Sequence, residues 1–242
     1  MSLIVGRKPV LEAINSGEQI EQVYFLYGQQ GGIVDVIRIA AKKRGIKCSE
    51  VQKDRFDALV KNQNSQGVAA RKAFQKFYTA QEIIKYSRQK KYPLVLLLDQ
   101  IQDPHNLGAI LRTAECSGVD GVFITRHNSA SVNDTVVKTS AGATEHIMIC
   151  VVNNISQMIK ELKENGFWIV GSTLSESVDY TEVDYKIPTA LIMGNEEKGI
   201  RKLTADLCDY KVKIPMSGKI QSLNVSVASG IILFELNRQR KI

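Results

Sequence analysis

The stretch Ile214-Pro-Met-Ser-Gly-Lys-Ile-Gln-Ser-Leu-Asn-Val-Ser-Val-Ala-Ser-Gly230 decides how this chain folds. A short run with β-branched residues precedes it and predicts a strand that ends at Pro215, because proline supplies no N–H to a sheet. A candidate helix cap follows the loop at Ser222 or Asn224, and apolar residues then recur at helical spacing. This strand, loop and helix could form an ordinary βα turn. The alternative is a ligand site, because open α/β sheets bind ligands at the carboxyl ends of their strands.

Strands and helices alternate along the chain from Pro93 onward. Leu94–Leu98 is a continuous apolar run that ends at Asp99, which is typical of a strand buried on both faces. We expect strands at 94–98, 121–125, 145–151, 167–171, 190–193 and 210–214, and helices at 107–116, 132–139, 155–165 and 201–208. This alternation predicts an α/β domain with a mostly parallel sheet covered by helices on both faces.

The first third of the chain differs in pattern. Residues 1–73 predict a compact α/β unit, with helices at 9–15, 31–44 and 56–61 and strands at 22–26, 46–51 and 68–70. Residues 74–92 interleave basic and aromatic side chains, and we interpret them as a linker with some helix. Interleaving of this kind suits contacts with a nucleic acid backbone and its bases. A connecting helix packed on its neighbour is an equally good interpretation.

Composition and charge limit the class of protein. With 242 residues, 44% of them hydrophobic and 24% charged, the chain is expected to be globular with one or two domains. It has no apolar run long enough for a membrane span and no signal-peptide pattern at its amino terminus. The four cysteines lie far apart without metal-ligand spacing, so we expect no metal, no disulfide and a reducing cytoplasm.

The positive charge is concentrated in the first part of the chain. Residues 1–91 carry 17 Lys and Arg against 8 Asp and Glu, whereas residues 92–242 carry 15 against 17. Such asymmetry favours a polyanionic partner, most often nucleic acid, bound by the amino-terminal part. A basic surface that serves only solubility is the alternative.

Three strand ends in the second domain carry unusual loops, at 99–114, 193–199 and 214–230. Gly194 and Gly199 allow close backbone approach to a ligand, and Arg112 could present a planar guanidinium to a phosphate. Each polar residue also has a purely structural interpretation: a cap for Asn106, a surface ion pair for Arg112, a helix-start acid for Glu196 and a capping hydroxyl for Ser222. The chain lacks G-x-G-x-x-G and the P-loop motif, which disfavours an NAD enzyme or a P-loop NTPase.

Together the three loops are similar to the three motifs of the SpoU/TrmH family, the RNA ribose 2′-O-methyltransferases. The stretches are Asp103-Pro-His-Asn-Leu-Gly-Ala-Ile-Leu-Arg-Thr-Ala114, Met193-Gly-Asn-Glu-Glu-Lys-Gly199 and Ile214 to Ala228. Val5-Gly-Arg-Lys-Pro-Val-Leu-Glu-Ala-Ile14 and Gln66-Gly-Val-Ala69 resemble the substrate-binding domain of that family. Ser65 departs from the family, in which many members carry His before Gln-Gly, and the change bears on RNA contacts.

The resemblance implies a division of the chain into a substrate-binding domain at 1–73, a linker at 74–92 and a methyltransferase domain at 93–242. The first domain would be L30e-like, and the second a SPOUT-type α/β domain with a trefoil knot. The implied partners are RNA, best matched by large-subunit (23S) ribosomal RNA methylated on a guanosine, and a second copy in a homodimer. The implied cofactor is S-adenosylmethionine, and the cysteine spacing and hydropathy described above predict neither a metal nor a membrane partner.

The resemblance also assigns residues. Cofactor contacts would come from Met193, Gly194, Ile214, Met216, Leu223 and Asn224, and the reactive centre from Asn106, Arg112, Glu196, Ser222 and Asn224. Two alternatives keep the same fold, namely a transfer RNA 2′-O-methyltransferase and a non-catalytic RNA-binding or ribosome assembly protein. A small-molecule α/β enzyme is a third, but it leaves the basic first domain unexplained.

Overall fold

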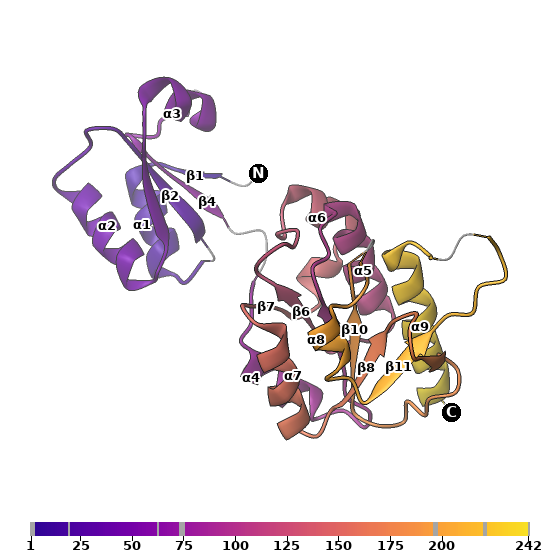
Figure 1. Cartoon of the computed structure of the whole chain (residues 1–242). Helices are drawn as coiled ribbons and strands as arrows, with labels where there is room; N and C mark the ends of the chain where they lie inside the picture. Colours follow the sequence, from indigo (N-terminus) through magenta and orange to yellow (C-terminus); the bar gives the residue numbers. More distant parts are fainter. Residues whose placement is uncertain are drawn as a thin grey trace. The chain divides into compact units, whose positions relative to one another are not determined.

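The computed structural model describes residues 3–18, 20–61, 63–72, 76–195, 198–219 and 222–241. It divides into two compact units, Met1–Lys76 and Phe77–Ile242, and each unit has its own sheet (Figure 1).

The first unit is a four-stranded sheet with helices on both faces. Its strands lie in the order β1-β4-β2-β3 and comprise β1 (Leu3–Val5), β2 (Ile20–Leu26), β3 (Lys47–Val51) and β4 (Val68–Lys72). Strand β4 is antiparallel to both of its neighbours, whereas β2 and β3 are parallel. Helices α1 (Arg7–Asn15) and α2 (Ile33–Lys43) pack with Phe25, and α3 (Lys53–Val60) packs with the adjacent Tyr24. Tyr24 and Phe25 therefore point to opposite faces of the sheet, as successive side chains of a β-strand do.

The second unit is built on a seven-stranded sheet in the order β7-β6-β5-β10-β8-β11-β9. All of its described strand pairs are parallel. The strands are β5 (Leu94–Leu98), β6 (Gly121–Thr125), β7 (Ile149–Val152), β8 (Trp168–Ser172), β9 (Val178–Asp179), β10 (Thr189–Met193) and β11 (Tyr210–Lys213). The predicted parallel α/β fold is confirmed. The predicted strand at 145–151 begins later, at Ile149, because Ala143–Glu145 forms a 3-10 turn.

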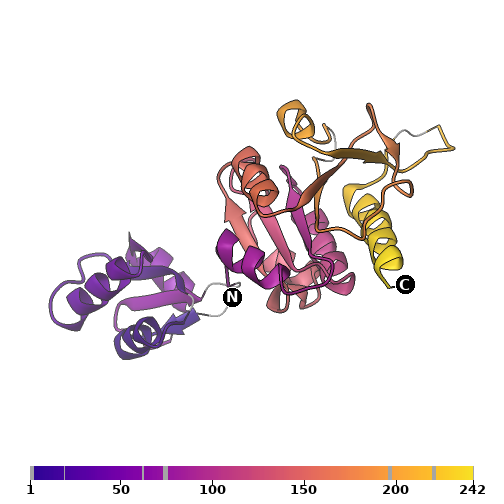
Figure 2. The same cartoon turned by 90° about the horizontal axis from the view of Figure 1, so that it is seen from below.

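Helices cover both faces of this sheet. Helices α5 (Pro104–Cys116), α6 (Asp134–Thr139) and α9 (Val225–Arg240) share one core with Leu96 of β5. Helices α4 (Ala80–Ser87) and α7 (Ile155–Glu164) share the other core with Leu97. Figures 1 and 2 show α7 and α9 on opposite sides of the sheet. All five residues of β5 are buried, as the continuous apolar run predicts.

The segment that precedes β5 belongs to the second unit. Helix α4 begins with a capping box, in which Thr79 and Glu82 bond to each other's backbone N–H groups. Its residues Ile83 and Ile84 are buried in the core shared with α7. The apolar side of this segment is therefore occupied by packing, and its basic residues face outward.

The end of α9 is tied to the beginnings of two strands. The Arg240 guanidinium donates hydrogen bonds at 2.9–3.1 Å to the carbonyl oxygens of Tyr92, Tyr185 and Ile187 and to Oγ1 of Thr189. Burial lowers the pKa of Arg240 to about 10. One side chain thus joins the carboxyl-terminal helix to the segments that lead into β5 and β10.

The trefoil knot stays a prediction, because strand order and pairing alone do not define how a chain threads a loop. Among the described helices, none is long and apolar enough to cross a membrane.

Candidate active site

Three loops meet at one edge of the second sheet. Strands β5 and β10 are adjacent and in register, with Met193 opposite Leu98, so the loops that follow them begin side by side. Strand β8 separates β10 from β11, whose loop leads into α9. Because the carboxyl ends of parallel strands share one edge, the three predicted motifs meet there.

A cavity of about 310 Å³ opens at this edge. It is lined by residues that follow β8, β10 and β11 and by the first turn of α9. Six of the predicted site residues line it: Met193, Gly194, Ile214, Met216, Ser222 and Leu223. Its volume is at the lower end of the range for small-molecule sites. The predicted cofactor contacts are therefore brought together, with the exception of Asn224.

The loop after β10 closes on itself. The N–H groups of Asn195 and Gly199 each donate to the other residue's carbonyl oxygen, at 3.0 and 2.9 Å. A Cβ atom on Gly194 would lie 2.2 Å from the carbonyl carbon of Gly199, so this position excludes every side chain. Gly199 adopts a φ of +65°, which glycine favours. The predicted catalytic residue Glu196 lies outside the described residues.

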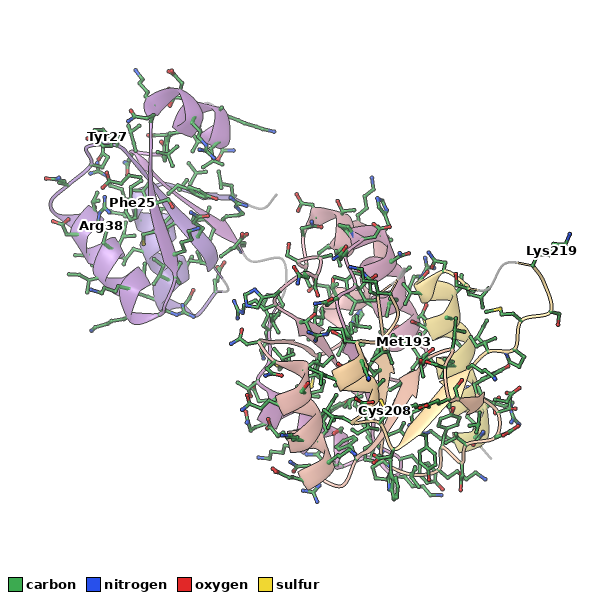
Figure 3. The ribbon with its side chains drawn as sticks, viewed as in Figure 1. Phe25, Tyr27, Arg38, Met193, Cys208 and Lys219 are labelled. Carbon is green, nitrogen blue, oxygen red and sulfur yellow. The ribbon has the colours of Figure 1, made fainter. Side chains whose placement is uncertain are left out.

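The loop before α9 exposes its side chains. Asn224, rather than Ser222, is the N-cap of α9, and its Oδ1 accepts from the N–H of Ser226 at 2.9 Å. Pro215 to Lys219 are exposed. In Figure 3, Lys219 lies at the outer end of this segment, whereas Met193 lies in the body of the unit.

Asn106 and Asn224 come together although 118 residues separate them. The Nδ2 group of Asn224 donates to Oδ1 of Asn106 at 3.0 Å. Asn106 is not a helix cap, because Asp103 caps α5 by accepting from the N–H of His105. This contact joins the first predicted motif to the third.

Arg112, a predicted catalytic residue, is not among the residues that line the cavity. It is exposed on α5. Within the described part of the chain it makes no hydrogen bond or ion pair, so the interpretation of Arg112 as one half of a surface ion pair gains no support. Its guanidinium is therefore available to a ligand on the face of α5.

A buried carboxylate beneath the loops was missed by sequence reasoning. The side chain of Asp99 is fully buried at the end of β5, and its Oδ2 accepts from Nε of Arg201 and from Oγ1 of Thr204, each at 3.1 Å. Its Oδ1 lies 2.8 Å from Nη2 of Arg201, an ion pair rather than a well-directed hydrogen bond. An acidic residue directly after an all-apolar strand was the signal that could have revealed it.

Gln100, the next residue, contacts the loop that follows β10 through its backbone. Its carbonyl accepts from Nδ2 of Asn195 at 3.0 Å, and its N–H donates to Oγ1 of Thr125 at 3.1 Å. Gln100 has a φ of +63°, a conformation uncommon for a residue with a side chain. Asp99 and Gln100 of the first loop thus contact residues on both sides of the second: Gln100 bonds Asn195 within it, and Asp99 pairs with Arg201 just after it.

The chemistry available at this edge is that of an organic ligand site. In the described ranges, no group of three or more His, Cys, Asp or Glu residues is placed to hold a metal ion. The cavity combines apolar Met193, Ile214 and Leu223 with polar groups on Thr173 and Ser175. Such a lining suits a molecule with one apolar and one polar end.

Comparison with known proteins identifies the two units. Residues 93–234 match the family model "SpoU rRNA Methylase family", and residues 3–78 match "RNA 2'-O ribose methyltransferase substrate binding". The chain belongs to the SpoU family of RNA methyltransferases. The predicted family, fold class and type of enzyme are therefore confirmed.

Two of the following three similar proteins extend over nearly the whole of this SpoU-family chain. A Bacillus subtilis protein named for the TrmH family of tRNA/rRNA methyltransferases is 35% identical over 98% of this chain and 95% of its own length. The crystal structure of an AdoMet-bound rRNA methyltransferase from Sinorhizobium meliloti is 28% identical, with a TM-score of 0.65, and covers 98% of this chain and 86% of that one. A TrmH/SpoU tRNA modifying enzyme from A. aeolicus is 36% identical, with a TM-score of 0.58, over 67% of this chain and 82% of its own. These likenesses support S-adenosylmethionine as the cofactor and RNA as the substrate.

Proposed function

We propose that this protein transfers a methyl group from S-adenosylmethionine to the ribose 2′-hydroxyl of a guanosine in large-subunit ribosomal RNA. The observation that carries the proposal is the convergence of the three family motifs on one edge of the sheet. The second and third motifs line one cavity, and the Asn106–Asn224 hydrogen bond joins the first motif to the third. The cavity fits the cofactor in character, because its lining combines apolar side chains with polar groups. Residues 1–73 would bind the RNA, and residues 93–242 would carry out the transfer.

The residues of this chain have three tasks in such a reaction. S-adenosylmethionine, when bound, supplies a methyl group on a sulfonium sulfur for in-line transfer to the ribose oxygen. Met193, Gly194, Ile214, Met216 and Leu223 would hold the cofactor, with Asn224 beside them. Most of the rate gain would come from placing the two reactants in attack geometry.

The ribose hydroxyl must also lose its proton. A guanidinium keeps its proton up to about pH 12, so we assign Arg112 to the adjacent phosphate and to the negative charge that develops on the ribose oxygen. The proton would pass to a phosphate oxygen or to water. Asn106, Glu196 and Ser222 would orient the loops around the reacting atoms.

Ribosomal RNA is favoured over transfer RNA by the extent of similarity. The rRNA methyltransferase covers both units of this chain, whereas the tRNA modifying enzyme covers 67% of it. The basic first part of the chain, which carries 17 Lys and Arg, supports a large polyanionic substrate in the cytoplasm. Transfer RNA remains the second candidate.

A homodimer is also part of the proposal. Val227 and Phe234 are each 50% exposed on α9, and their spacing of seven residues places them on one side of the helix. Covering them with a second copy would remove apolar surface from water. Phe234→Arg should shift the protein from dimer to monomer in sedimentation velocity, and a wild-type protein that sediments as a monomer would contradict the dimer.

Mapping of ribose methylation tests the proposed substrate. Ribosomal and transfer RNA from a strain lacking the gene should be missing one 2′-O-methylguanosine in 23S rRNA and no mark in transfer RNA. Wild-type protein should restore that mark, whereas Arg112→Ala should not. Loss of a transfer RNA mark alone would replace ribosomal with transfer RNA as the substrate.

A further inference from the structure

A second cavity lies at the opposite edge of the same sheet. It has a volume of about 620 Å³ and surrounds the amino ends of β5, β6 and β7, where Leu94, Asp120 and Met148 line it. The candidate active site lies at the carboxyl ends of the strands, so the two cavities are at opposite ends of the strands. The reaction proposed above makes no use of this second cavity.

Aromatic and cationic side chains make up much of the lining. Tyr78, Tyr86 and Tyr92 all line the cavity, and Tyr86 is 41% exposed. The Lys90 ammonium, also in the lining, lies 4.9 Å from the ring centroid of Tyr86. Exposed aromatic rings paired with cations are the features by which proteins bind unpaired bases and their phosphates.

The same cavity is also lined by hydrogen-bonding groups. Asp120 is 8% exposed, its Oδ2 accepts from the N–H of Leu94 at 2.8 Å, and burial raises its pKa to about 6. His146 is exposed in the same lining. Together they add acceptors and donors to the lining, which the edge of a base requires.

The three tyrosines all belong to residues 74–92, the segment in which basic and aromatic side chains are interleaved. Its apolar side packs on the sheet through Ile83 and Ile84. Its outward side remains exposed, with Lys85, Arg88, Lys90 and Lys91. Core packing therefore accounts for the apolar residues of this segment but not for its exposed basic and aromatic residues. Two of these exposed residues, Tyr86 and Lys90, line the cavity.

We propose that this cavity binds an unstacked nucleotide of the RNA substrate, with the base against the tyrosines and its phosphate near Lys90. The inference rests on RNA being the substrate of this enzyme. The site would hold RNA without reacting with it, so it would contribute to RNA affinity and to the choice of target, but not to cofactor binding.

Binding of short single-stranded RNA to the full-length protein tests the proposal. Fluorescence anisotropy with a labelled oligonucleotide should show about tenfold weaker binding for Tyr86→Ala. Tyr86→Phe should bind nearly as wild type, because the ring is retained. Lys90→Ala should also bind more weakly. The matched controls are Tyr210→Ala, an exposed tyrosine outside the cavity, and Lys85→Ala, an exposed lysine of α4 that does not line the cavity.

The outcomes separate the alternatives. Wild-type RNA affinity in Tyr86→Ala would overturn the proposal, as would an equal loss in Lys90→Ala and Lys85→Ala, which would indicate general electrostatics. A change in sedimentation with Tyr86→Ala would instead make the cavity a protein interface. Cofactor affinity, measured by calorimetry, should remain unchanged in every variant. The readout uses short RNA, so it holds even if ribosomal RNA proves not to be the substrate.

Discussion

Asp99 and Arg201 are 102 residues apart in the chain, and they form a two-point contact beneath the candidate active site. Asp99 ends the strand that leads into the first motif, and Arg201 follows the loop of the second motif. The pair therefore helps to fix the position of the first loop relative to the second. A fully buried carboxylate is stable there only because Arg201 and Thr204 are bonded to it.

Replacing Asp99 should loosen the loop that follows β10. Asp99→Asn removes the charge and leaves Arg201 without its partner, so we expect about tenfold weaker binding of S-adenosylmethionine by calorimetry. Thr204→Val keeps the ion pair and should cost much less. Equal affinities in wild type and Asp99→Asn would show that the loop is held by Gln100 and Asn195 alone.

Gly194 should tolerate no side chain. Gly194→Ala places a methyl group inside the closed loop, where the nearest atoms belong to Gly199 and Ile200. The loop must shift, and we expect roughly a hundredfold loss of cofactor affinity, measured by calorimetry. The matched control is Gly218→Ala, because a Cβ there meets nothing within 4 Å. Comparable losses in both variants would contradict this account.

Arg112 should require its planar shape as well as its charge. Arg112→Lys keeps a cation but cannot bond a phosphate at two points, so kcat should fall about a hundredfold with little change in cofactor affinity. Single-turnover methyl transfer to RNA at saturating cofactor measures this. Near-wild-type turnover in the lysine variant would reject the two-point role.

Arg240 should stabilise the second unit. Arg240→Lys cannot reach all of the carbonyl groups that the guanidinium joins, and the free energy of unfolding should fall by about 2–3 kcal/mol. Arg126→Lys is the control, since Arg126 is exposed and its Nε donates to Oδ1 of Asn153, and it should change stability by less than about 0.5 kcal/mol. Urea unfolding followed by circular dichroism compares the two, and equal stabilities would contradict the role of Arg240.

Asp120 should make stability depend on pH. Its folded-state pKa of about 6 lies above the ordinary value of 3.8, so the folded state holds the proton more tightly. The resulting stabilisation is complete below about pH 4 and is lost as the pH rises through about 6. Relative to wild type, Asp120→Asn should gain about 2 kcal/mol between pH 4 and pH 7 in urea unfolding. Since His146 lines the same cavity, the comparison is repeated with His146→Gln in both proteins, and a constant difference across this range would refute the prediction.

Local sequence patterns predicted most of the secondary structure. The apolar run at 94–98, the glycine stops and the helical spacing after Asn224 each depend on residues close together in the chain. Two strands escaped this reasoning, β1 and β9, which have three and two residues. Each pairs with a single neighbour at the edge of its sheet, and so short a strand shows no periodicity.

The sequence by itself determined the family, the two-part organisation and the three loops of the candidate site, because motifs and glycine positions are local properties. Only the tertiary structure decided which residues meet. It joined Asn106 to Asn224 and Asp99 to Arg201, placed Arg112 outside the cavity of its own chain, and opened a second cavity around Tyr86. The physical reason is that such contacts depend on strand order, which brings the distant β5 and β10 side by side, and no local pattern records that order.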